Sequence, residues 1–204
     1  MITLTLSGIA QFLQSPMAAL ERMRETAPGV QAGVLALCAA TFVMVVIDFA
    51  YGPYAFPHTL EPGGKRDATV YFVAFVETAR IFGVASIILI GTRHFLRAQV
   101  TVAEVLWMTV PYGLALIAFE LVQLLAWLIV LGAGLNFYGQ FFLLGFLGSC
   151  LILVASIRTL TPDRDWLAVL PLAAAAFVFG TFFAPIVLLG TAVYLAVRGA
   201  RHRN

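Results

Sequence analysis

The sequence predicts an all-α membrane protein: a polytopic helical bundle of five transmembrane helices, preceded by an amphipathic helical segment at the membrane interface. Of its 204 residues, 62% are hydrophobic, and the mean hydropathy is +0.98. The apolar residues gather in runs of roughly 20 or more, the length needed to cross a bilayer. Charged residues make up only 11% of the chain, whereas soluble domains have about 25%.

Residues 1–27 are expected to form the amphipathic segment. Apolar residues recur three or four positions apart from Ile2 to Met23, with polar residues between them, which is typical of an amphipathic helix. Ser15 and Pro16 match an N-cap followed by proline at the first helical position, which predicts two short helices lying in the membrane interface. A cytosolic helix packed on the loops of the protein is the alternative, because amphipathicity alone does not separate the two.

Residues 28–204 are expected to form the transmembrane domain. Thr101 and Glu104 match a capping box at the start of the third span. The fifth apolar run has about 31 residues, too few for two full crossings and a turn, so we expect one long kinked helix. A re-entrant hairpin at Gly180 to Pro185 is the alternative, and it would return the basic tail to the cytoplasmic side, as the positive-inside rule favours. The predicted spans cover about 30–50, 69–90, 102–131, 137–157 and 167–197.

Polar side chains inside or at the edge of the apolar runs are the candidate site. A charge at the bilayer centre costs about 3 kcal/mol and therefore faces protein, water or an opposite charge. Glu77 and Arg80 are three residues apart on one helix face and can pair. The cluster predicts an ion-pair network that fixes the register of the helices, or a proton or cation site, because three acids around one arginine leave a carboxylate able to carry a proton. In a third arrangement Asp48 and Glu120 simply reach interfacial water. Its members are Asp48, Glu77, Arg80, Glu120 and Gln123.

Small residues on the fourth span predict close helix packing. Gly145, Gly148 and Ser149 fall within this span, and small side chains let membrane helices approach each other closely. The contact they favour lies either within the monomer or between chains.

The motifs of common enzymes are absent from the sequence. His58, His94 and His202 fall in predicted loops or the tail, and neither an HExxH motif nor a phosphate-binding GxxxxGK[ST] loop occurs. Neither a metal nor a cofactor is therefore expected. The basic residues are scattered singly or in pairs beside apolar segments, so no nucleic-acid-binding face is expected. These observations together predict a protein that is not an enzyme.

The whole plan resembles a known family. The entry segment Phe12-Leu-Gln-Ser-Pro16-Met-Ala-Ala-Leu20, five closely spaced spans and Pro111 midway along the third make the chain similar to the Yip membrane family, the Ypt/Rab-interacting proteins, as a short bacterial-type member. The stretch from Thr101 through Pro111 is also similar. The resemblance implies a five-helix integral membrane protein with a cytoplasmic N-terminus. Eukaryotic relatives bind small GTPases through a longer cytosolic N-terminal region that is absent here, so GTPase binding is not expected.

Two functions follow as hypotheses, and a third, that the paired N-terminal helices sense or bend membranes, follows from the amphipathic segment. The first is a non-enzymatic scaffold or accessory protein of a bacterial inner (cytoplasmic) membrane. It would bind other membrane proteins, self-associate or organise membrane lipids. The second is a small proton- or cation-coupled transporter that uses the intramembrane Asp, Glu and Arg cluster.

Overall fold

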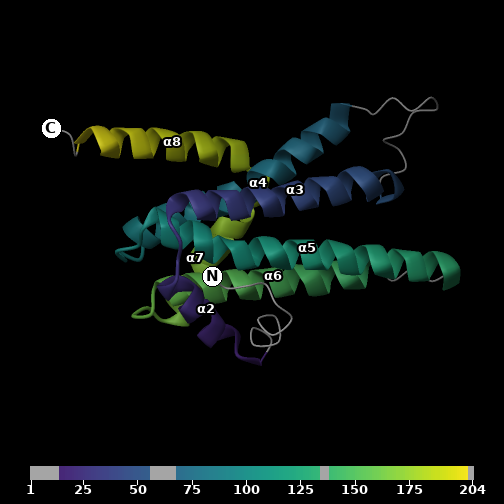
Figure 1. The fold of residues 1–204 in the computed structure, drawn as a ribbon, viewed down its shortest axis with the longest axis horizontal. Coiled ribbons are helices and arrows are strands. Elements are labelled where there is room, and N and C mark those ends of the chain that lie inside the picture. Colours follow the sequence, from purple (N-terminus) through teal and green to yellow (C-terminus); the bar gives the residue numbers. More distant parts are fainter. Residues whose placement is uncertain (1–13, 56–67, 134–137, 202–204) are drawn as a thin grey trace.

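The part of the chain that the structure describes is entirely helical (Figure 1). The computed structural model describes residues 14–55, 68–133 and 138–201, with side chains described over 14–47 and 79–119, at 121, 122 and 125, and over 147–198. Seven helices and no strands occur in these ranges. They are α2 (Pro16–Glu25), α3 (Val30–Ala55), α4 (Ala68–His94), α5 (Val102–Ala133), α6 (Tyr138–Leu160), α7 (Trp166–Phe182) and α8 (Ala184–Arg201).

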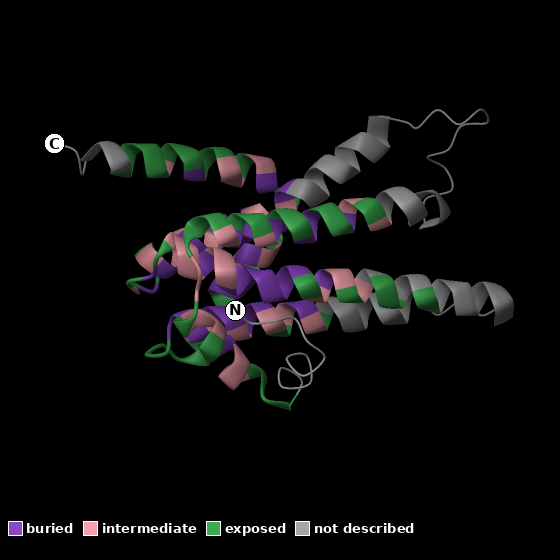
Figure 2. Ribbon diagram, in the orientation of Figure 1, coloured by how far each residue is buried: buried purple, intermediate pink, exposed green. Residues whose placement is uncertain are grey.

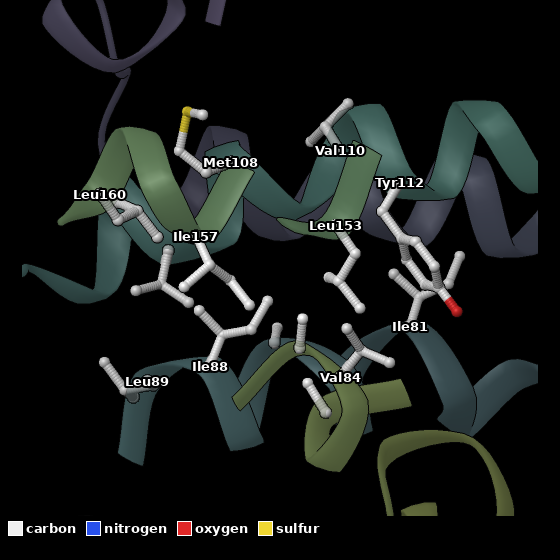
Figure 3. Close-up of a cluster of buried hydrophobic side chains, with 14 of the residues drawn as sticks. Ile81, Val84, Ile88, Leu89, Met108, Val110, Tyr112, Leu153, Ile157 and Leu160 are labelled. Atoms are coloured by element: carbon white, nitrogen blue, oxygen red, sulfur yellow. The ribbon is translucent and has the colours of Figure 1, made fainter. Parts of the chain in front are cut away.

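The long helices α3, α5 and α6 lie side by side, and α4 and α7 pack against them (Figure 1). Figure 3 shows Val84 and Ile88 of α4 facing Leu153 and Ile157 of α6 across the centre. These side chains are at most 1% exposed. Because lipid chains are as apolar as leucine, packing complementarity of this kind holds membrane helices together better than hydrophobicity does.

Helix α2 packs on the bundle. Its one fully buried residue is Leu20, and Met17 and Met23 pack against the same core. Ser15 is the N-cap residue and Pro16 the first helical residue, as the sequence predicts. The interfacial position of residues 1–27 stays a prediction, and residues 1–13 lie outside the described part.

The fifth predicted segment is two helices, not one kinked helix. The chain leaves the helical conformation at Phe183 (φ −120°, ψ 20°), and α7 and α8 meet at 109°. Pro185 explains the break, because it has no N–H to donate to the carbonyl of Thr181 and its ring clashes with that carbonyl. The break falls between Gly180 and Pro185, where the alternative prediction places a re-entrant hairpin.

The close crossing of α4 and α7 rests on two glycines. A β-carbon at Gly83 would lie 2.5 Å from the carbonyl oxygen of Gly180, and one at Gly180 would lie 2.6 Å from the backbone nitrogen of Val84. Carbon atoms in ordinary contact are about 3.5–4.0 Å apart. The two backbones therefore touch, and neither position has room for a side chain.

Two of the described helices are long and apolar enough to cross a membrane. They are α3 over Val30–Ile47 and α5 over Val102–Phe119, and the bent pair α7–α8 is a third if it counts as one span. In α4 and α6 the side chains are described only from Ala79 and Leu147 onwards. The described helices thus indicate a membrane protein with two or three candidate spans, and the number five stays a prediction.

We expect Gly180→Ala to lower the melting temperature of the detergent-purified protein by roughly 5 °C, because forcing a methyl group into a filled contact costs about 1–3 kcal/mol. The control is Gly190→Ala on α8, where a β-carbon meets nothing within 4 Å. Alanine is the better helix former, so this variant should melt no lower than the wild type. Equal melting temperatures for Gly180→Ala and the wild type would contradict the backbone contact.

Candidate functional site

Of the predicted polar cluster, only Arg80 has a described side chain. It lies on α4 and is half-buried. Asp48, Glu77, Glu120 and Gln123 lie on α3, α4 and α5, but their side chains fall outside the described set. The pairing of Glu77 with Arg80 therefore stays a prediction.

Tyr112 lies next to Arg80 and Thr181 inside the bundle. The phenol of Tyr112 on α5 interacts electrostatically with the Arg80 guanidinium and with the hydroxyl of Thr181 on α7. Tyr112 is fully buried and Thr181 is 8% exposed, although the Tyr112 hydroxyl has no hydrogen bond of ordinary geometry. Figure 3 shows the ring of Tyr112 beside Ile81 at the edge of the apolar core. Tyr112 on α5 therefore lies near polar groups of both α4 and α7.

Sequence reasoning missed Tyr112 and Thr181. The position of Tyr112 could have indicated a buried polar contact. Tyrosines in membrane helices favour the lipid–water interface, whereas this one follows Pro111 well inside an apolar run. Thr181 gave no such signal. Threonines in membrane helices commonly bond to a carbonyl of the preceding turn, as Thr191 does to Val187 at 2.8 Å.

A second polar site ties α2 to the start of α5 and the end of α6. The Arg24 Nε donates to Glu104 Oε1 at 3.2 Å, and its Nη1 donates to the carbonyl oxygen of Thr159 at 2.9 Å. The other carboxylate oxygen of Glu104 accepts from the backbone N–H and the hydroxyl of Thr101, both at 2.8 Å. The Glu104 N–H donates back to the Thr101 hydroxyl at 3.1 Å. The predicted capping box is confirmed.

The start of α7, the end of α4 and part of α8 lie at the same end of the bundle as the Arg24–Glu104 ion pair. The Arg158 guanidinium, on α6, donates to the carbonyl of Thr161 at 2.9 Å and lies 6.0 Å from the centre of the Trp166 ring, at the start of α7. His94, the last residue of α4, contacts Tyr194 of α8. We call this part of the bundle the arginine end, defined by Arg24, Arg93, Arg97, Arg158 and Arg198.

The predicted packing residues of α6 differ in environment. Ser149 is 2% exposed, whereas a β-carbon at Gly148 would meet nothing within 4 Å. Gly145 lies outside the described side chains. Among the described residues Gly148 therefore makes no close helix contact, whereas glycines on α3, α4 and α7 do.

The described side chains do not form a metal-binding site. Among the residues with described side chains, no group of three or more His, Cys, Asp or Glu is placed to hold a metal ion. Arg80, Tyr112 and Thr181 can anchor helices or bind an anion. They supply none of the carboxylate, imidazole or thiolate groups that usually bind metals.

Comparison with protein-family models, curated proteins and solved structures finds no match for this chain. The resemblance to the Yip family therefore stays a prediction from the sequence.

Substitutions at Glu104 should separate its two tasks. Glutamine can still bond to Thr101 but cannot form the ion pair, so we expect Glu104→Gln to cost less than about 1 kcal/mol. Glu104→Ala loses both interactions and should cost about 1 kcal/mol more. Thermal unfolding in detergent measures both, with Glu25→Ala at an exposed position of α2 as the control. Identical melting temperatures for the two Glu104 variants would refute the role of the capping box.

Proposed function

We propose that the protein is a non-enzymatic scaffold or accessory protein of the bacterial cytoplasmic membrane, which binds a transmembrane helix of another membrane protein through the outer side of α8. The observation that carries this proposal is the exposed apolar surface of α8. This helix turns away from α7 at the 109° bend, packs against α4 and leaves its other side exposed (Figure 2). Small GTPases are not expected among its partners.

The topology that fits this proposal has four crossings, α3 to α6, and a re-entrant α7–α8 pair. The start of α7 lies beside Arg158, and α8 reaches the end of α4 through Tyr194. Both parts of the pair therefore reach the arginine end of the bundle. With the arginines on one side, the positive-inside rule favours a cytoplasmic location for this end. This arrangement replaces the kinked fifth span expected from the sequence.

The outer side of α8 has the features of a helix-binding surface. Figure 2 shows most of this helix exposed, and among the described helices it packs mainly against α4 and α7. Ala192 and Ala196 are exposed and four residues apart, a spacing of small residues that lets a second helix approach closely. Lipid chains gain nothing from such a spacing, whereas a partner helix does. Exposed apolar residues flank the pair: Ile186 (70%), Leu189 (69%) and Val193 (58%).

The transporter hypothesis stays a prediction from the sequence. It depends on Asp48, Glu77 and Glu120, whose side chains lie outside the described set. Arg80 with Tyr112 and Thr181 supplies one positive charge and two hydroxyls, which serve equally well as a helix anchor.

The proposed topology can be tested with reporter fusions in a bacterial host. A fluorescent protein fused to the C-terminus should fluoresce, because that reporter folds in the cytoplasm, and alkaline phosphatase at the same position should be inactive. A phosphatase fusion within residues 56–67, between α3 and α4, should be active and serves as the control. An active phosphatase at the C-terminus would refute the re-entrant pair.

The partner surface can be tested by mild extraction of the tagged protein from its native membrane and mass spectrometry of what co-purifies. We expect a near-stoichiometric membrane protein with the wild type and at least a fivefold loss with Ala192→Leu/Ala196→Leu, because two leucines hold the helices apart. Ala39→Leu makes the same change at an exposed alanine of α3 and should retain the partner. Equal recovery with the double variant, or a wild type that emerges alone, would overturn the proposal.

A further inference from the structure

A basic cleft opens at the arginine end, between the last turn of α4, the connection of residues 95–101 and the C-terminal part of α8. Its volume is about 1090 Å³. We define the basic cleft by its basic side chains and the tyrosine between them: Arg93, His94, Arg97, Tyr194 and Arg198. None of the described residues that line it is acidic. We propose that the basic cleft binds a phosphate group, that of an anionic phospholipid at the cytoplasmic surface of the membrane.

Tyr194 holds the two walls of the cleft together. Its hydroxyl lies 2.9 Å from His94 Nε2 and accepts a hydrogen bond of 2.9 Å from Arg198 Nη1. The two rings meet edge to face, with centres 5.3 Å apart and planes at 78°. These contacts join the end of α4 to α8 and hold the Arg198 guanidinium at the wall of the cleft.

Arg93 is fixed by a backbone carbonyl on the other side of the cleft. Its Nε and Nη2 both donate to the carbonyl oxygen of Val100, at 3.0 and 2.9 Å. A guanidinium has five N–H donors in a rigid fork, so donors remain after these two bonds. Arginine forks match phosphate oxygens well, and a side chain already held in place loses less entropy when a ligand binds.

Arg97 is placed by an unusual backbone conformation. Its φ of 53° is the only positive value at a non-glycine residue within the described ranges, and L-residues adopt this conformation at a cost. The turn is held by the Ala98 N–H, which donates to the carbonyl oxygen of Thr92 at 2.9 Å. The Arg97 side chain is exposed and has no hydrogen bond or ion pair with other described residues.

The cleft gathers positive charge without an internal counter-ion. The carboxylate beside it belongs to Glu104, which already binds Arg24 and Thr101. Three guanidinium groups in one cleft repel one another, and a bound anion removes that repulsion. A concave site lined by one sign of charge also raises the local concentration of the opposite ion. A phosphate thus supplies the charge that the protein itself does not place there.

The surroundings of the cleft favour a lipid as the source of the phosphate. Phe95, two residues before Arg97, is 72% exposed, and Val197 lines the cleft on α8. The cleft lies where the apolar helices end, which is the level of lipid headgroups, and basic pockets between membrane helices at that level bind anionic headgroups. A free phosphate ion shares the chemistry of the headgroup but gains nothing from the apolar rim.

The test is native mass spectrometry of the full-length protein in detergent, titrated with phosphatidylglycerol, with phosphatidylcholine of the same acyl chains, and with inorganic phosphate. The wild type should bind phosphatidylglycerol more tightly than phosphatidylcholine. Arg97→Gly and Arg198→Gln should each weaken phosphatidylglycerol binding about fivefold, the effect of one basic residue near a membrane surface. Both variants should weaken phosphatidylcholine binding less, because the choline cation offsets the charge of its phosphate.

These variants separate binding from folding. Glycine adopts a positive φ readily, so Arg97→Gly should keep the fold and the melting temperature. Arg164→Gln removes an exposed charge outside the cleft lining and should bind like the wild type. Equal phosphatidylglycerol binding by wild type and cleft variants would overturn the site. Displacement of the lipid by millimolar inorganic phosphate would overturn the lipid as its ligand. The isolated protein is used, so the result does not depend on a partner at α8.

Discussion

The backbone contact between Gly83 and Gly180 is the constraint from which the arrangement of the C-terminal helices follows. Because the two backbones touch there, α7 is held against α4 until it ends at Phe182. The next helix begins at Ala184, whose β-carbon also lies at the Gly83 crossing. From that point the 109° bend directs α8 along the last turns of α4, where Tyr194 meets His94. The basic cleft thus depends on a glycine pair that contributes none of its charges.

Features that depend on neighbours in the chain could be predicted from the sequence. The capping box joins Thr101 to a residue three positions later, so its spacing alone indicates it. The helices α3 to α6 were predicted close to their actual positions, because long apolar runs bounded by polar turns define them. Pro185 likewise marks a possible break, but whether the chain bends there depends on what α7 packs against, and that information lies in α4.

Contacts between distant helices could not be predicted in the same way. Arg80, Tyr112 and Thr181 meet from three helices, and no spacing in the sequence relates them. Glycines are common in membrane helices, so their presence does not show which pair touches. Gly148 was selected because it neighbours other small residues, yet it faces open space, whereas Gly83 and Gly180 are 97 positions apart (180 − 83) and make the contact.

The arginines at one end of the bundle differ in how far the protein itself uses them. Arg24 and Arg158 are engaged by carboxylate and carbonyl oxygens of α5, α6 and the turn after α6. Arg93 and Arg198 are positioned by one oxygen each, and Arg97 by its backbone alone. All five charges contribute to orientation in a membrane, because the positive-inside rule counts charge. Arg24 and Arg158 do not line the basic cleft, whereas Arg93, Arg97 and Arg198 do. Substitution of Arg24 or Arg158 therefore changes the charge that orients the protein without removing a donor from the cleft.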